Sequence, residues 1–367
     1  MRRALPPLWL AQPSRYANVS TPAARALLAS LALLVLLGLM ALIVADPTAA
    51  GPSPQGTDLQ LYAAIVDALR HDGAYYSVAA DALRFGAYPL KPFVTFRLPT
   101  LAVVQAALPP LATIALLYLL AAGVALAWLA RFREAFRRPL AITVALLLLA
   151  GGCIACWQAE LVAFHEVWAG LLIALSLARY RPDRWEEAVG WALAAALIRE
   201  TAALYLVVMA LLAWRDGARR EVIGWAVALG VLAAVIAAHA HAVSQVVRVG
   251  DPASPGWAGL LGPGFPVRTW HASTALSLLP LALAAPLVAL ALAGWTAWTA
   301  PVASRAAATL GAYAVLLAVA GRLDTFYWGL LTAPVLLIGL AFAVDGLRDL
   351  FAAALDTRRI VVRRVIP

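Results

Sequence analysis

Long apolar runs separated by short polar segments dominate the chain. A helix that crosses a bilayer needs about 20 mostly apolar residues. Runs of about this length cover residues 25–45, 111–130, 140–157, 161–178, 221–243, 275–297, 306–320 and 327–345. Because a helix satisfies its backbone hydrogen bonds internally, the pattern predicts an all-α polytopic membrane protein. We expect about eight full spans in a single transmembrane domain over residues 1–367.

One further stretch, 187–213, is apolar at both ends but carries Arg199 and Glu200 at its centre. Basic clusters at 179–184 and 215–220 flank it. Cytoplasmic loops carry an excess of Lys and Arg, so both clusters favour the cytoplasm, and one straight helix would separate them. We therefore predict a re-entrant or short helical hairpin whose charged tip is buried in protein.

The arginines predict the orientation of the whole chain. They precede the first apolar run, fill the segment 131–138 and recur in a basic tail at 346–367. By the same positive-inside rule, we expect both termini in the cytoplasm. The net charge of +9 then reflects topology and an attraction to anionic lipid headgroups. It does not indicate a nucleic-acid partner.

Composition supports a membrane protein. Hydrophobic residues make up 64% of the chain and charged residues 13%, against about 25% charged in soluble proteins. The bias towards Ala, Leu and Arg, with Lys91 as the only lysine, is typical of a bacterial protein and predicts the inner membrane. Cys153 and Cys156 have the spacing of a redox motif, but they lie within a predicted span, which favours a packing role.

Two long segments are predicted on the periplasmic side. The first, 46–98, contains two stretches with apolar residues at helical spacing, 58–70 and 76–85. Such amphipathic helices usually lie in the membrane interface. The second, 244–274, is rich in Gly and Pro and shows no periodicity, so we expect an irregular loop.

The first periplasmic loop carries a series of polar and aromatic positions. It contains Asp58, Tyr62, Gly73-Ala-Tyr-Tyr76 and Phe96-Arg-Leu-Pro99. These residues resemble the GT-C superfamily of glycosyltransferases, in particular the bacterial mannosyltransferase-like and aminoarabinose-transferase-like members. The resemblance covers about the first hundred residues best. It implies an enzyme that uses a polyprenyl-phosphate sugar, with its catalytic Asp in this loop.

The resemblance implies that Asp58 is the catalytic base, which takes a proton from the acceptor hydroxyl. The departing polyprenyl phosphate needs a cation, and Arg97 is a candidate donor-phosphate contact, with Tyr62 as a substrate-binding residue. Simpler roles remain open. Asp58 at a helix start favours the helix dipole, and Arg97 could extend to the lipid headgroups.

A second group, Glu160, His165 and Glu166, lies near the same predicted membrane face. Carboxylates and an imidazole there could bind the acceptor or a divalent metal, Mg²⁺ or Mn²⁺. The second His of a metalloprotease motif is missing. The alternative is a structural hydrogen-bonded cluster, although such a cluster is costly at a span end unless it faces a cavity.

Two arginines complete the candidate site. Arg199 is a candidate donor-phosphate contact, or else forms an ion pair that holds the hairpin. Arg322 and Asp324 precede the last predicted span, where they could bind the donor phosphate and the sugar, respectively.

The sequence therefore predicts a glycosyltransferase of the bacterial cell envelope. It would transfer a sugar from a polyprenyl-phosphate donor to a lipid, glycan or protein acceptor at the periplasmic face. A transporter or flippase for a lipid-linked sugar is the main alternative, but it needs polar residues along a path through the membrane. A non-catalytic subunit of an envelope-synthesis complex would tolerate loss of Asp58.

Overall fold

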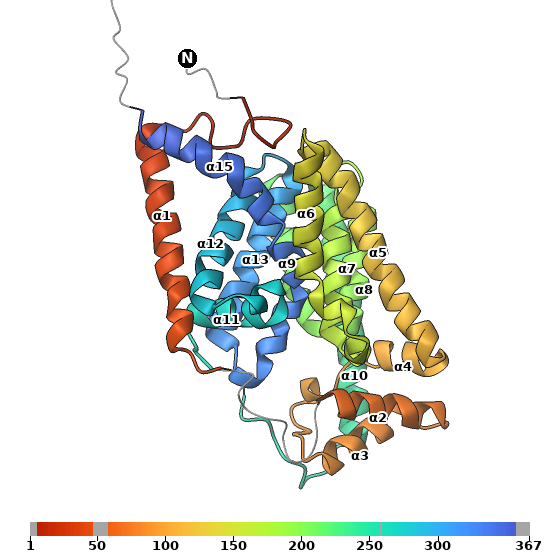
Figure 1. Cartoon of the computed structure of the whole chain (residues 1–367). Coiled ribbons are helices and arrows are strands. Elements are labelled where there is room, and N and C mark those ends of the chain that lie inside the picture. The colour runs from red at the N-terminus through yellow and green to blue at the C-terminus, as the bar shows by residue number, and fades with distance from the viewer. Residues whose placement is uncertain (1–5, 47–57, 257–258, 357–367) are drawn as a thin grey trace, which may run out of the picture.

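The computed structural model describes residues 6–46, 58–256 and 259–356. Over these ranges the chain is helical and forms no extended strands, only isolated bridges (Figure 1). The first helices are α1 (Thr21–Leu39), α2 (Asp58–Arg70), α3 (Tyr75–Phe85), α4 (Thr100–Ala107), α5 (Pro110–Ala135), α6 (Pro139–Gly152), α7 (His165–Arg179) and α8 (Glu186–Ile198). They are followed by α9 (Ala203–Arg215), α10 (Arg219–Val246), α11 (Gly264–Ser273), α12 (Leu281–Ala297), α13 (Pro301–Ala320), α14 (Ala333–Leu336) and α15 (Gly339–Ala354).

Short 3₁₀ segments extend or connect these helices. They are η1 (Met40–Ile43), η2 (Phe93–Thr95), η3 (Ile154–Trp157), η4 (Ala159–Ala163), η5 (Glu200–Ala202), η6 (Ala275–Leu278) and η7 (Leu323–Leu331). The first long loop forms α2 and α3 where its amphipathic pattern predicts helices. Within the second long loop, 244–274, where the sequence shows no periodicity, the chain forms α11, which is largely buried.

Four helical segments of the described chain are long and apolar enough to cross a membrane: Thr21–Ile43, α5, α10 and α13. A fifth span results if η7 and the following Ala333–Ala354, bent by 57°, are counted as one. The prediction of eight full spans is thus met only in part. The shorter apolar helices α6 and α12 have 14 and 17 residues, about 21 and 26 Å at 1.5 Å per residue, against a hydrocarbon core of about 30 Å.

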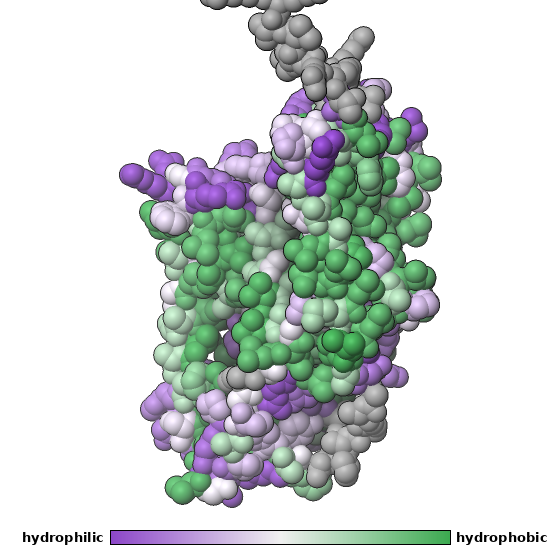
Figure 2. Space-filling model, turned by 90° about the vertical axis from the view of Figure 1, so that its left-hand side faces the viewer, coloured by the Kyte–Doolittle hydropathy of each residue, from purple (hydrophilic) through white to green (hydrophobic). Residues whose placement is uncertain are grey.

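The surface has a hydrophobic belt between two polar ends. Figure 2 shows hydrophobic residues over the middle of one face and hydrophilic residues gathered towards its top and bottom. Large apolar side chains on the long helices are exposed, among them Leu111 at 81% and Ile223 at 62%. A soluble protein rarely exposes a continuous apolar surface of this kind. The belt is compatible with a multi-pass membrane protein.

The core is built around α7, on which every residue from His165 to Ala178 is buried. Helix α7 packs against α5 on one side and α8 on another, and α12 packs against α15. Glycines bring backbones close together at these crossings. A Cβ on Gly294 would lie 1.8 Å from the carbonyl oxygen of Gly339, so only glycine permits this approach.

The stretch 187–213 forms two helices, α8 and α9, separated by a break at Arg199 and η5. Both helices pack against α10. Trp185, just before α8, lies against Gly224 in α10, and α9 ends immediately before α10 begins. The start of α8 and the end of α9 therefore lie at the same end of the molecule.

The N-terminal segment and α15 meet at that same end, away from α2 and α3 (Figure 1). The carboxylate of Asp345 accepts hydrogen bonds from the backbone N–H groups of Leu8, Trp9 and Leu10 at 2.7–2.8 Å. Helix α15 continues to Ala354 and so includes the first residues of the predicted basic tail, 346–367. We call this the terminal end and the opposite one the α2–α3 end.

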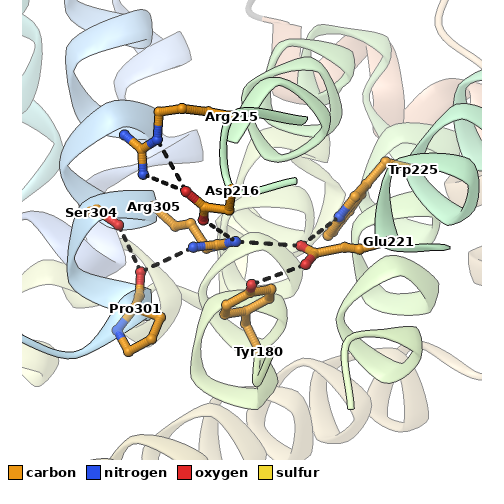
Figure 3. A network of polar contacts seen from close by, with 8 residues as sticks. All are labelled: Tyr180, Arg215, Asp216, Glu221, Trp225, Pro301, Ser304 and Arg305. Carbon is orange, nitrogen blue, oxygen red and sulfur yellow. Dashed lines mark hydrogen bonds and ion pairs between the residues drawn. The ribbon is translucent and has the colours of Figure 1, made fainter. Parts of the chain in front are cut away.

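A group of polar residues, buried except for Asp216, joins the helices near the terminal end (Figure 3). Arg305 Nη2 lies 3.2 Å from Asp216 and 3.6 Å from Glu221, and the guanidinium stacks over the ring of Tyr180 at 4.1 Å. Trp225 and Tyr180 each donate a hydrogen bond of 3.2 Å to Glu221. This Arg305 cluster (Tyr180, Asp216, Glu221, Trp225 and Arg305) connects α7, α10 and α13.

Candidate functional site

A pocket of about 510 Å³ lies at the α2–α3 end. Its walls come from α2, α3, the segment that follows them, the start of α7, the second long loop and η7. Six of the residues singled out from the sequence line it: Asp58, Tyr62, Arg97, His165, Arg322 and Asp324. Segments far apart in the sequence thus bring most of the predicted site together.

Asp58 is the first residue of α2 and is half-buried in the pocket wall. The hydroxyl of Tyr88 donates a hydrogen bond of 2.9 Å to its Oδ1 atom. Burial raises the pKa of Tyr88, and the negative charge of Asp58 raises it further. Tyr88 therefore stays protonated at neutral pH and holds the carboxylate in a defined position.

Arg97 occupies the centre of the polar part of the site. Its Nε donates to the Tyr62 hydroxyl at 3.0 Å, and Nη2 donates to the Tyr327 hydroxyl at 3.4 Å. Tyr75 donates to the backbone carbonyl of Arg97 at 2.7 Å. Burial raises the pKa of Tyr62 despite the nearby Arg97 charge, so neutral hydroxyls, not phenolates, surround this guanidinium.

Arg97 belongs to a set of charges that extends from the pocket into the protein interior. We call this set the Arg199 cluster (Arg97, Glu166, Arg199 and Glu200). Arg199 Nε is 2.5 Å from Glu166, and the two side chains are 2% and 0% exposed. Arg199 also pairs with Glu200, which lies 3.7 Å from Arg97. Two arginines and two carboxylates balance in charge, as buried ions require. Arg199 and Glu166 support Arg97 from behind, and the pocket lining does not include them.

His165 is the first residue of α7 and is only 3% exposed. Its ring packs edge-on against Tyr62, with centroids 4.9 Å apart. Neither ring nitrogen has a hydrogen-bond partner among the described residues. An imidazole of this kind in a pocket wall retains its capacity to bind a ligand.

The predicted metal ligands do not converge. Glu160 is exposed on η4 and does not line the pocket, while Glu166 is paired with Arg199. Across residues 6–46, 58–256 and 259–356, no group of three or more His, Cys, Asp or Glu side chains is placed to hold a metal ion. Glu160, His165 and Glu166 therefore do not fit the divalent site that their spacing indicated.

The two long loops are joined beside the pocket. Arg84 on α3 forms two hydrogen bonds with Asp251, at 2.9 and 2.8 Å. The hydrogen bonds from Arg84 hold the pKa of Asp251 below its usual range. The backbone of Lys91 accepts from Ser254 N–H at 2.7 Å, and Arg322 donates to the Gly256 carbonyl at 3.1 Å.

Sequence reasoning missed Tyr75, Tyr88 and Tyr327 as pocket residues, as well as the contribution of Ser254. Tyr75 and Tyr88 lie in the first long loop, where the density of tyrosine was a usable signal. Ser254 gave no such signal, because only the pairing of the two loops brings it to the pocket.

Comparisons with protein-family models, with curated proteins and with solved structures find no match for this chain. What can be said of its function therefore rests on the residues and geometry described above.

Proposed function

We propose that this protein is an integral membrane glycosyltransferase of the GT-C type. It transfers a sugar from a polyprenyl-phosphate donor to an envelope lipid, glycan or protein acceptor. The reaction takes place at the periplasmic face of the bacterial inner membrane, with both termini in the cytoplasm. The observation that carries the proposal is the pairing of a positioned carboxylate, Asp58, with a buried guanidinium, Arg97, in one pocket.

The chemistry divides between these two side chains. Asp58 accepts the proton of the acceptor hydroxyl as its oxygen forms the new bond to the anomeric carbon. The bond from that carbon to the phosphate oxygen breaks, and the charge developing on the polyprenyl phosphate is stabilised by Arg97. Arg97 is well suited to this, because its orientation is fixed before the reaction by Tyr62 and Tyr327.

The remaining pocket residues suit a sugar. Four tyrosines line the pocket, providing flat apolar faces and polar hydroxyls, the combination typical of small-molecule sites. Arg322 and Asp324 form an ion pair of 2.6 Å in the pocket lining and bind the donor phosphate and sugar hydroxyls there. His165 contacts the acceptor. We assign no step to a metal ion.

A transporter or flippase for a lipid-linked sugar is the second candidate. It would need polar groups along a path through the apolar belt. In the Arg199 cluster, Glu166 lies in the first turn of α7 and Arg199 at the break between α8 and α9. Arg199 is already paired with two carboxylates. This arrangement favours a binding pocket open at one end of the molecule over a polar path through the membrane.

The proposal is tested by mass spectrometry of lipids and envelope glycans from a deletion strain. The strain is complemented with wild type, Asp58→Asn or Asp67→Asn. Asp67 is an exposed carboxylate on the same helix and serves as the matched control. We expect the deletion to accumulate a polyprenyl-phosphate sugar and lose one envelope sugar, with wild type and Asp67→Asn restoring both.

Asp58→Asn should restore neither at equal expression. If Asp58→Asn complements fully, Asp58 is not the base, and the non-catalytic subunit becomes the better description. If the lipid-linked sugar accumulates only on the cytoplasmic side of the membrane, the transporter takes its place.

A further inference from the structure

The turn that ends α6 brings the two cysteines of the chain together. Cys153 follows α6 directly, and Cys156 lies in η3. The N–H of Cys156 donates to the carbonyl of Cys153 at 2.8 Å, which closes a turn between residues i and i+3. In a 3₁₀ segment side chains three residues apart lie on the same face, and a closed turn of this kind keeps the two Cα atoms within about 7 Å.

A second observation places both sulfur atoms on the same side. Cys153 and Cys156 both line one cavity of about 260 Å³ between α5 and α6, and their side chains are 8% and 4% exposed. A disulfide needs Cα atoms about 4.4–6.8 Å apart and Cβ vectors that converge. The hydrogen-bonded turn keeps the two Cα atoms close to this range, and the shared cavity places both side chains on one side of the turn.

The position along the chain suggests an oxidising environment. Helix α6 begins directly after the arginine-rich segment 131–138, which the positive-inside rule assigns to the cytoplasm. Its other end, with both cysteines, then lies at the periplasmic face, where disulfides form and persist. We propose that Cys153 and Cys156 form an intramolecular disulfide in the mature protein. This proposal does not depend on the reaction that the protein catalyses.

The bond forms by thiol–disulfide exchange before the turn is buried. The two thiols lose two protons and two electrons, and one S–S bond forms between them. The oxidant is a periplasmic protein disulfide, which is reduced to two thiols in the exchange. Once the turn packs between α5 and α6, burial protects the bond from thiol reductants.

The bond has a structural consequence for the candidate site. Segment η3 leads through η4 to His165, and η3 and η4 pack on each other. The Val162 carbonyl in η4 accepts hydrogen bonds from Gln105 at 2.6 Å and from Trp168 at 2.7 Å. A disulfide at the start of this connection restricts the chain that places His165 in the pocket wall.

The test counts free thiols. Membranes expressing the protein are quenched in acid, denatured, and treated with a maleimide carrying a polyethylene glycol chain, with or without prior reduction. The chain has only two cysteines, so each gel shift reports on this pair. We expect no modification without reductant and two modifications after it. Cys153→Ser and Cys156→Ser should each show one modification without reductant.

Two results would overturn the proposal. One is double modification of the unreduced wild-type protein, which would mean that both thiols are free. The other is a non-reducing gel on which the chain runs as a dimer that reductant separates, since the disulfide would then join two chains.

Discussion

The Arg305 cluster and the Arg199 cluster each hold a buried arginine between two carboxylates, but they differ in the hydrogen bonds that their buried glutamates accept. In the Arg305 cluster both oxygens of Glu221 accept hydrogen bonds, from Trp225 and Tyr180. In the Arg199 cluster Glu166 has its ion pair with Arg199, and neither oxygen has a hydrogen-bond partner within the described residues.

The second difference is what lies beside each cluster. The Arg199 cluster continues through Arg97 into the pocket, next to a His165 whose ring nitrogens also have no partner in the described part of the chain. Buried polar groups normally have hydrogen-bond partners. Buried side chains that lack such partners next to a pocket therefore indicate a place for a ligand. A buried arginine alone does not, because Arg305 pairs with Asp216 and Glu221 and has a structural role between helices.

The largest expected effect is on stability, from Arg305→Met. The substitution leaves Glu221 buried without its cation, and breaking a buried pair in this way costs about 3–5 kcal/mol. We expect a clear fall in the thermal unfolding temperature of the purified protein in detergent. Arg215→Met is the matched control, because Arg215 pairs with the same Asp216 but is 60% exposed, and it should change stability little. Equal effects of the two substitutions would show that burial of Arg305 contributes nothing.

The next effect is on activity, from Arg97→Gln. Removing a group that stabilises charge in the transition state typically costs about 10²–10³ in rate. We expect a loss of this size in sugar transfer to the envelope acceptor. Arg322→Gln should cost less, because Arg322 is 28% exposed and already paired with Asp324. If Arg322→Gln instead costs more than Arg97→Gln, the donor phosphate lies against Arg322.

A smaller effect is expected from Tyr88→Phe, which removes the hydrogen bond to Asp58. A hydrogen bond to a charged group contributes about 1.5–3 kcal/mol, so turnover should fall by roughly tenfold or somewhat more. We expect kcat to fall while KM changes little, because the hydrogen bond positions Asp58 and does not touch the substrate. A rise in KM with kcat unchanged would mean that Tyr88 contacts substrate instead.

The sequence predicted the parts of this site that depend on local pattern. The amphipathic spacing placed α2 and α3, and the arginine-flanked stretch 187–213 was expected to turn at Arg199, where the chain breaks. The sequence could not predict which carboxylate of another helix forms an ion pair with Arg199. Along the chain, α7, a short loop and α8 separate Glu166 from it, and only the packing of α7 against α8 brings the two together.

The span count was met only in part, for a related reason. Apolar runs show which residues avoid water, but they do not show where a helix ends. At 140–157 and 275–297 the apolar pattern continues through η3 and η6, so the α-helices are shorter than the runs. The pairing of the two long loops was equally hidden, because Asp251 and Arg84 are far apart in sequence and each looks like an ordinary surface charge.

The smallest expected effect concerns that pairing and its dependence on pH. Because Arg84 lowers the pKa of Asp251 in the folded protein, this carboxylate contributes to loop attachment at every pH above its unfolded pKa, about 3.9. The contribution is lost only as the pH falls through the lower folded pKa of Asp251.

We expect the amides of residues 247–254 to be more protected from exchange in the wild-type protein than in Asp251→Asn at pH 7. The same difference should remain at a pH of about 4. Asp81→Asn is the control, since Asp81 contacts the same arginine but is 73% exposed, and it should leave the protection unchanged. If the difference in protection between the wild-type protein and Asp251→Asn disappears well above a pH of about 4, the Arg84–Asp251 contact does not join the second loop to α3.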